Sequence, residues 1–144
     1  MNHIDYQADF YAWTQQQAKL LRNKEIKQID WCNVAEEIED MGRSEKRQLE
    51  SRLEILIMHL LKWQFQPNLR SRSWQLTIKE QRLRLEKLLA ENPSLKSSLA
   101  DIKEKIYPLA VISAEKETGL SSFPETCPYD LTEIFAPEFF PDNN

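Results

Sequence analysis

The chain has 144 residues, only two of them cysteine and two glycine, and a formal net charge of −4. A chain of this length predicts one domain over residues 1–144, large enough to bury roughly two thirds of its unfolded surface without metal or disulfide staples. Helix formers dominate and β-branched residues are sparse, so we expect an all-α fold without a sheet. The N-terminal residues MNHIDYQADF show no basic segment before an apolar run, and Cys32 and Cys127 form neither a CxxC pair nor a secreted spacing pattern, so we expect a cytosolic protein.

The first predicted helix begins at Asp5 as its N-cap, and its inward residues recur at steps of three and four. These residues are Tyr6, Phe10, Trp13, Gln17 and Leu21. The period is lost at 24–29, which predicts a connection. A short helix over 33–41 then begins at Asn33, has Val34, Ile38 and Met41 inward, and ends at Gly42, a residue typical of the left-handed position after a helix.

The central helix is predicted to begin at Ser44, after a turn at Gly42 and Arg43, and to end near Gln66, because Pro67 cannot continue it. Its core stripe has steps of four and three and consists of Leu49, Leu53, Leu56, Leu60 and Trp63. Residues 55–61 are apolar nearly all round, which indicates burial on several sides. Seven residues are too few to span a bilayer, so we expect no membrane partner.

Two further helices and an irregular segment complete the prediction. The third helix begins at Ser73 and has Trp74, Ile78, Gln81, Leu85 and Leu88 inward. The fourth runs over 94–118, is kinked by Pro108, ends before Gly119, and has Leu95, Leu99, Ile102, Ile106, Leu109 and Ser113 inward. Residues 121–144 hold four prolines and four phenylalanines and predict a strap with one helical turn at 131–135. The predicted architecture is an antiparallel bundle of four longer helices plus one short helix and this strap.

Several motifs along the chain form a recognisable set. They are DFYAW, NVAEEIEDMGRSE, MHLLKW, RSRSW before an arginine-bearing helix, and ETGL before FPETCPY. With these motifs the chain resembles the cyanobacterial family catalogued as domain of unknown function 29, over nearly its whole length. The resemblance implies an all-helical fold, and it supplies no established activity, cofactor, partner or functional residue.

Charge is distributed unevenly along the chain. Residues 1–42 have a net charge of −4, residues 43–87 of +6 and residues 88–144 of −6. Either the acidic flanks neutralise the middle, or the basic middle third (residues 43–87) binds an anionic or protein partner. The residues predicted to bind are Arg43, Arg47, Arg70 and Arg72. Nucleic acid is a less favoured partner, because the basic residues cover several helix faces and alternate with glutamates.

A polar row lies beside the core stripe of the central helix. Its members are seven residues apart: Glu45, Arg52, His59 and Gln66. Polar groups so near a core need partners, and the turn at Gly42 would bring Glu37 toward Arg52. The row is either an open site, with His59, Glu37 and Arg52 as catalytic candidates, or a closed structural network. No nucleophile is spaced to complete a triad with His59, which favours the structural reading.

Four carboxylates lie before this row: Glu36, Glu37, Glu39 and Asp40. Carboxylates three residues apart on bundle helices can hold Mg²⁺ or Mn²⁺. Compensation of the helix dipole and ion pairing explain the same cluster, and we favour them. Cys32 is predicted to be a buried small hydrophobe.

Two hypotheses about function follow. The leading one is a non-catalytic helical interaction module that binds a protein or anionic partner through the basic middle third. The alternative is a metal-dependent phosphohydrolase built on 36–40 with His59. No cofactor is implied beyond Mg²⁺ or Mn²⁺, and the sequence does not decide between enzyme and non-enzyme or predict an oligomeric state.

Overall fold

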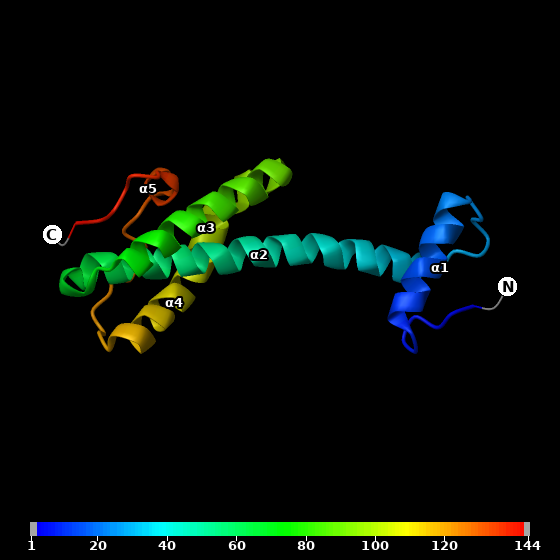
Figure 1. Ribbon diagram of the computed structural model, residues 1–144, viewed down its shortest axis with the longest axis horizontal. Helices are drawn as coiled ribbons and strands as arrows, with labels where there is room; N and C mark the ends of the chain where they lie inside the picture. The colour runs from blue at the N-terminus through cyan, green and yellow to red at the C-terminus, as the bar shows by residue number, and fades with distance from the viewer. Residues whose placement is uncertain (1–2, 143–144) are drawn as a thin grey trace. The chain divides into compact units, whose positions relative to one another are not determined.

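The structure is a computed structural model, and it describes residues 3–142. All regular structure in these residues is helical, and the helices are α1 (Phe10–Arg22), α2 (Trp31–Phe65), η1 (Pro67–Leu69), α3 (Arg72–Glu91), η2 (Pro93–Ser98), α4 (Leu99–Thr118) and α5 (Leu131–Phe135) (Figure 1). The predicted all-α class and the four longer helices are confirmed, but the short helix is α5, whereas the short helix predicted over 33–41 is the first part of α2. No helix in the described part of the chain combines the length and apolar character that crossing a membrane requires.

The chain divides into two compact units, unit 1 (Met1–Ser44) and unit 2 (Glu45–Asn144). Helix α2 contributes its first turns to unit 1 and its longer remainder to unit 2. Unit 1 also holds α1, and unit 2 holds α3, α4 and α5. The single domain expected over residues 1–144 stays a prediction.

Helix α2 runs without interruption through the place where a turn is predicted. The prediction is wrong because Gly42 keeps a helical conformation, and the only described glycine with a positive φ is Gly119. A glycine inside a helix costs about 1 kcal/mol relative to alanine, too little to end a helix flanked by strong helix formers. The helix is continuous where the turn was expected to bring Glu37 back toward Arg52, so the expected ion pair between them is also wrong.

Unit 1 is held together where α1 meets the start of α2. Trp13 and Gln17 are buried on α1, and both bind Asp30. Trp13 Nε1 donates to the Asp30 carboxylate over 3.0 Å, and the Asp30 amide donates to Gln17 Oε1 over 2.8 Å. Asn33 Nδ2 donates to the same carboxylate over 2.8 Å, and the hydrogen bonds from Asn33 and Trp13 lower the pKa of Asp30. The polar residue predicted inward on the first helix, Gln17, is thus a structural group.

The N-cap of α1 lies four residues later than predicted. Asp9 accepts the amide of Ala12 over 3.0 Å, whereas Asp5 accepts the amide of Gln7 in the preceding turn. Leu20 takes the inward position expected for Leu21, which is 42% exposed. The stripe of α1 therefore ends on a step of three residues instead of four.

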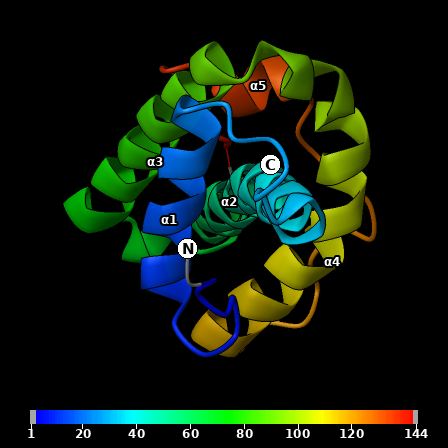
Figure 2. The ribbon, with the colours of Figure 1, turned by 90° about the vertical axis from the view of Figure 1, so that its right-hand side faces the viewer.

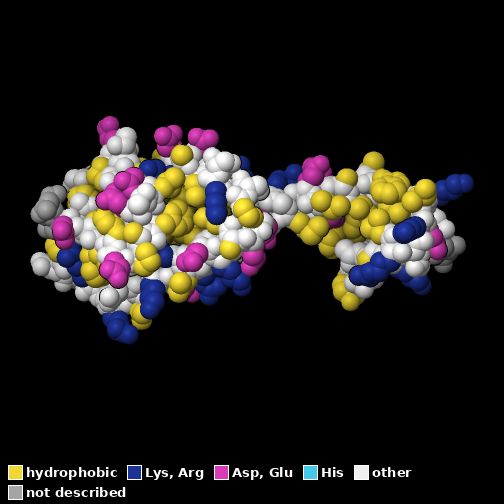
Figure 3. All heavy atoms as spheres, turned by 90° about the horizontal axis from the view of Figure 1, so that it is seen from above, with side chains coloured by type: hydrophobic (Ala, Val, Ile, Leu, Met, Phe, Trp, Pro, Cys, Tyr) yellow, Lys and Arg dark blue, Asp and Glu magenta, His cyan; other side chains and the backbone are white. Residues whose placement is uncertain are grey.

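Unit 1 leaves much apolar surface uncovered. Among its described residues, seven large hydrophobic side chains are exposed: Phe10, Tyr11, Leu21, Ile26, Trp31, Ile38 and Met41. Figure 3 shows hydrophobic side chains gathered over the face of unit 1 that it presents. The inward positions predicted for Ile38 and Met41 are wrong, with 59% and 62% exposure, and so is the burial predicted for Cys32. A unit of this size has too few residues to cover every apolar side chain.

The core of unit 2 forms where α2, α3 and α4 meet, and Figure 2 shows α3 and α4 on different sides of α2. Helix α2 buries Leu49, Leu53, Leu56, Ile57, Leu60 and Leu61. Helix α3 buries Ile78, Gln81, Arg82, Leu85, Leu88 and Leu89. The predicted stripes of both helices are confirmed, except that Trp63 and Trp74 are only partly buried. Lys62 Nζ lies 4.6 Å from the Trp74 ring centroid, so this tryptophan stacks under a buried cation.

Helix α4 departs from prediction after Pro108, which it contains. Leu109 is 53% exposed, and the buried face continues through Ala110 and Ala114 instead of Leu109 and Ser113. The sequence pattern placed the larger Leu109 inward and gave no weight to the small alanine side chains, which are the ones that face the core. Gly119 ends the helix as predicted, in the left-handed conformation with φ of 75°.

The C-terminal segment is fastened to unit 2 largely through Arg82, which is 5% exposed. Its guanidinium donates to four backbone carbonyls: Ile134 at 2.8 Å, Phe139 at 2.8 Å, Pro137 at 3.3 Å and Glu133 at 3.4 Å. Tyr129 Oη donates to Gln64 Oε1 over 2.7 Å, and Tyr107 Oη donates to the Pro124 carbonyl over 2.6 Å. The segment is therefore docked, as its aromatic composition predicts.

Candidate functional site

A pocket of about 250 Å³ lies between α2 and α3 of unit 2. It is lined by Glu45, Gln48 and Arg52 from α2 and by Arg84, Lys87, Leu88 and Glu91 from α3. Steps of three and four residues put each set on one face of its helix. Leu88 is buried and anchors the pocket to the core, while the other side chains supply its polar wall. We refer to this site as the α2–α3 pocket.

The three cations of the α2–α3 pocket have incomplete partners. Arg52 Nη1 donates to Gln81 Oε1 over a long 3.4 Å, and Arg84 Nε donates to Glu80 over 2.9 Å. Lys87 Nζ lies 4.0 Å from Glu91 Oε1. A guanidinium has five N–H donors, so both arginines keep donors for another acceptor. Exposed ion pairs contribute roughly 0–1 kcal/mol, so a ligand can replace them at little cost.

Charged side chains dominate the lining of the pocket. The lining includes no hydroxyl, thiol or imidazole group, although the Lys87 amine and the carboxylates of Glu45 and Glu91 are also groups that can act as nucleophiles. Guanidinium and ammonium groups are the usual partners of carboxylate and phosphate groups. The lining holds three cations and the two carboxylates of Glu45 and Glu91, and Glu80, which is outside the lining, pairs with Arg84.

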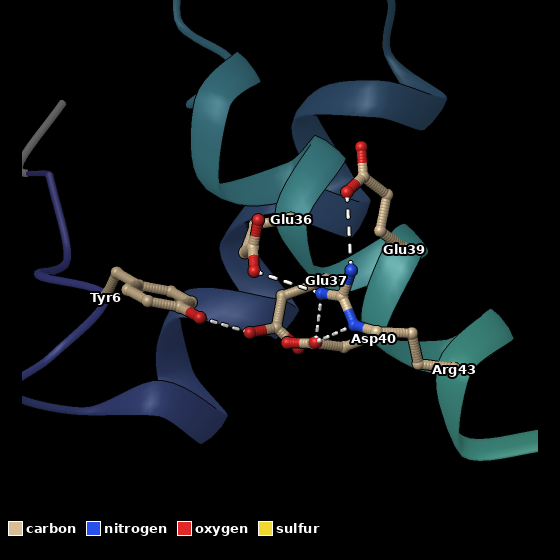
Figure 4. Close-up of polar contacts among 6 residues, drawn as sticks. All are labelled: Tyr6, Glu36, Glu37, Glu39, Asp40 and Arg43. Atoms are coloured by element: carbon tan, nitrogen blue, oxygen red, sulfur yellow. Dashed lines mark hydrogen bonds and ion pairs between the residues drawn. The ribbon is translucent and has the colours of Figure 1, made fainter. Parts of the chain in front are cut away.

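The predicted acidic cluster forms around Arg43 in unit 1 (Figure 4). The Arg43 guanidinium pairs with Glu36 at 3.1 Å, with Glu39 at 3.5 Å and with Asp40. The fourth carboxylate, Glu37, accepts a hydrogen bond from the Tyr6 hydroxyl. The four acids are therefore satisfied by an arginine from their own helix and by a tyrosine that precedes α1.

This arrangement resembles an ion-pair network more than a metal site. The Arg43 guanidinium lies among three of the carboxylates, where a bound cation would otherwise balance their charge. Within residues 3–142, no group of three or more His, Cys, Asp or Glu side chains is arranged to hold a metal ion. The hydrogen bond to Glu37 raises the pKa of Tyr6 to about 12, because the neutral hydroxyl is the donor.

His59 is partly buried and hydrogen-bonded to the backbone of its own helix. Its Nδ1 lies 2.9 Å from the Ile55 carbonyl one turn earlier, and an Nδ1–H can donate there. Burial lowers the pKa of His59, while the bond to Ile55 opposes this shift. His59 and Gln66 lie seven and fourteen residues beyond Arg52, and neither lines the α2–α3 pocket. Of the predicted polar row, Glu45 and Arg52 line this pocket.

The four arginines predicted to bind a partner have different environments. Arg43 holds the acidic cluster, and Arg70 Nε donates to the Trp63 carbonyl over 2.8 Å with its guanidinium 5.1 Å from the Trp63 ring centroid. Arg47 and Arg72 are exposed, on α2 and α3. None of the four lines the α2–α3 pocket.

Comparison with known proteins gives one positive result. The family model described as "Domain of unknown function DUF29" matches residues 6–140. The chain belongs to this family. No curated protein and no solved structure matches it. The DUF29 description carries no activity, so the function of this DUF29 chain has to be inferred from its own geometry.

The α2–α3 pocket of this DUF29 chain is only partly visible in its sequence. Arg52 and Glu45 belong to the predicted polar row, and Arg84 is one of many basic residues in 43–87. No motif or periodic row in the sequence singles out Lys87 or Glu91 as a site residue. The spacing Arg84, Lys87, Glu91 marks one helix face, but only the pairing of α3 with α2 shows that this face meets Arg52.

Proposed function

We propose that the protein is a non-catalytic helical interaction module that binds an anionic group of a protein partner in the α2–α3 pocket. The observation that supports this most is the meeting of Arg52, Arg84 and Lys87 at one pocket whose lining includes no hydroxyl, thiol or imidazole group. At about 250 Å³ the pocket is smaller than usual sites for drug-sized ligands, which begin near ~300 Å³. It suits a single carboxylate or phosphate group presented on a larger molecule.

The charge pattern favours a discrete anionic group over a nucleic acid. Arg43 pairs with acids of its own helix and Arg70 with the Trp63 carbonyl, which reduces the number of unpaired basic groups in 43–87. Glu45 and Glu91 interrupt the cations of the pocket and would repel a continuous phosphate backbone. We also propose a cytosolic location and a cyanobacterial source, both on the sequence features described above. No geometry among residues 3–142 favours the metal-dependent phosphohydrolase as a second candidate.

The proposal is tested by calorimetric titration with two probes, an acidic glutamate-rich peptide and tripolyphosphate. Arg52→Gln should weaken binding about tenfold or more, because it removes a charge-assisted hydrogen bond. The matched control is Lys46→Gln, which removes one charge from the same helix at an exposed position outside the pocket. The control should bind within about twofold of wild type at moderate salt, where distant charges are screened.

The relative affinity of the probes identifies the chemistry of the partner's anionic group. Tighter binding of the peptide assigns carboxylate groups, and tighter binding of tripolyphosphate assigns phosphate groups. Failure of both probes to bind would overturn the proposal. Equal loss in Arg52→Gln and Lys46→Gln would also overturn it, because a diffuse field and not the pocket would then attract the anion.

A further inference from the structure

One face of α2 in unit 1 is exposed although its residues are apolar or small. At roughly 100° per residue, Trp31, Ala35, Ile38 and Gly42 lie within one narrow sector of the helix. All four are exposed, with Trp31 at 55% and Ile38 at 59%. We call these four residues the α2 N-terminal face. An apolar face of this kind on a regular helix marks a surface that associates.

The residues on this face alternate between large and small. If two copies of α2 pair antiparallel about a two-fold axis between positions 36 and 37, Trp31 of one copy lies opposite Gly42 of the other. The same axis places Ile38 opposite Ala35. Large side chains then meet small ones at every position, which is the self-complementarity that a two-fold interface requires.

Gly42 is otherwise unexplained. It lies in the interior of α2, where glycine lowers helix stability, and it does not have the positive φ that would require glycine. A Cβ added at Gly42 would meet nothing within 4 Å in the single chain. The chain itself therefore does not need the missing side chain, whereas a second helix packed closely against this position does.

The surroundings of the face are compatible with a second copy. Met41 lies on one flank at 62% exposure, and the Trp31 indole is fixed by its Nε1–H donating to the Ile26 carbonyl over 3.1 Å. At 100° per residue, Glu36, Glu37 and Asp40 lie about 130° or more from the centre of the face, so these three acids do not meet their counterparts in a second copy. Glu39 lies about 70° from the centre, on the other flank from Met41, and pairs with Arg43 of its own helix.

The available area is enough for a small interface. Ile26, Trp31, Ile38 and Met41 are between 55% and 62% exposed, which corresponds to roughly 450 Å² for side chains of their size. Ala35, Gly42 and the aliphatic parts of neighbouring side chains raise the surface area that each copy can bury to roughly 600 Å². The interface would then bury about 1,200 Å² in total, which is the lower end of the range for specific interfaces. An interface of this size gives a reversible dimer.

We propose that the protein forms a weak two-fold dimer in which the α2 N-terminal faces of two copies pack antiparallel, with Trp31 against Gly42. This surface is separate from the α2–α3 pocket, and the proposal does not depend on anion binding.

The test is sedimentation equilibrium of the full chain under reducing conditions, from about 1 µM to about 200 µM, the range in which an interface of this size dissociates. Wild type should pass from monomer to dimer over this range. Gly42→Leu should weaken association more than tenfold, and Ile38→Gln should do the same without a bulky insertion. The matched control is Ser44→Leu, an exposed position two residues along the helix and about 160° from Gly42 at 100° per residue; it should dimerise like wild type.

Circular dichroism separates loss of pairing from loss of folding. In dilute solution Gly42→Leu should melt at the wild-type temperature or above it, because leucine is the better helix former. Three results would overturn the proposal: a wild type that stays monomeric, both face variants dimerising like wild type, or open-ended oligomers instead of a dimer. A monomer whose tryptophan fluorescence responds to phosphatidylcholine vesicles would also overturn it and assign the face to a lipid surface.

Discussion

Replacing Arg82 by lysine should loosen the C-terminal segment from unit 2. Arg82 is 5% exposed, and its guanidinium holds four backbone carbonyls between residues 133 and 139. A lysine keeps the charge but is a compact donor that reaches one or two of these carbonyls. Hydrogen bonds from charged groups contribute about 1.5–3 kcal/mol each, so the loss of two or three of them should lower the free energy of unfolding by about 3 kcal/mol or more.

Urea denaturation measures this loss, and amide hydrogen exchange over 133–139 shows where it occurs. The control is Arg84→Lys, two residues along α3, where the arginine is exposed and pairs with Glu80. The control should change stability by less than about 0.5 kcal/mol. If Arg82→Lys unfolds within that same margin of wild type and exchange over 133–139 is unchanged, the four carbonyl contacts do not hold the segment.

Three other predictions follow from the core, from His59 and from the acidic cluster. Leu56→Ala or Leu60→Ala should cost about 2–5 kcal/mol by cavity formation, since both leucines are fully buried; a loss below about 1 kcal/mol for both in urea denaturation would contradict this core. Because burial lowers the pKa of His59, the unfolded chain binds a proton more readily than the folded chain, so the free energy of unfolding should fall as the pH drops below 6.5. His59→Gln should make that fall less steep in urea denaturation at several pH values, and a pH dependence equal to that of wild type would contradict this role of His59. Glu37→Gln should lower the pKa of Tyr6 from about 12 toward 10 in an absorbance titration, while Mg²⁺ or Mn²⁺ should leave the wild-type melting temperature unchanged; a melting temperature that rises with metal would instead support a metal site.

The sequence predicted the helices of unit 2 well because their residues obey one period. The stripes through Leu53 and Leu85 are continuous, and their steps of three and four are dictated by burial on one face. The end of the fourth helix at Gly119 followed from the same local physics, since glycine alone takes the left-handed position without strain.

The errors arose where local signals compete with tertiary context. Gly42 is a residue type typical of a helix end, but α2 continues through it. The ion pair expected for Glu37 depended on a turn at Gly42 and was therefore wrong as well. Arg43, which was predicted to bind a partner, lies three, four and seven residues after three acids and pairs with all three; the sequence analysis did not anticipate these pairs. The α2–α3 pocket needs two helices to form, and no periodicity within either helix specifies that Arg52 meets Lys87.

The binding role of the α2–α3 pocket is tested most directly by ¹H–¹⁵N NMR of the full chain during titration with the tighter of the two probes. The Arg52 and Arg84 side-chain Nε–H signals and the Gln48 side-chain amide lie at the pocket and should shift together with one saturating curve. The side-chain signal of Arg70, which is bound to the Trp63 carbonyl, should not move. Shifts confined to residues outside the pocket, or no saturable shift at all, would contradict the proposed binding site.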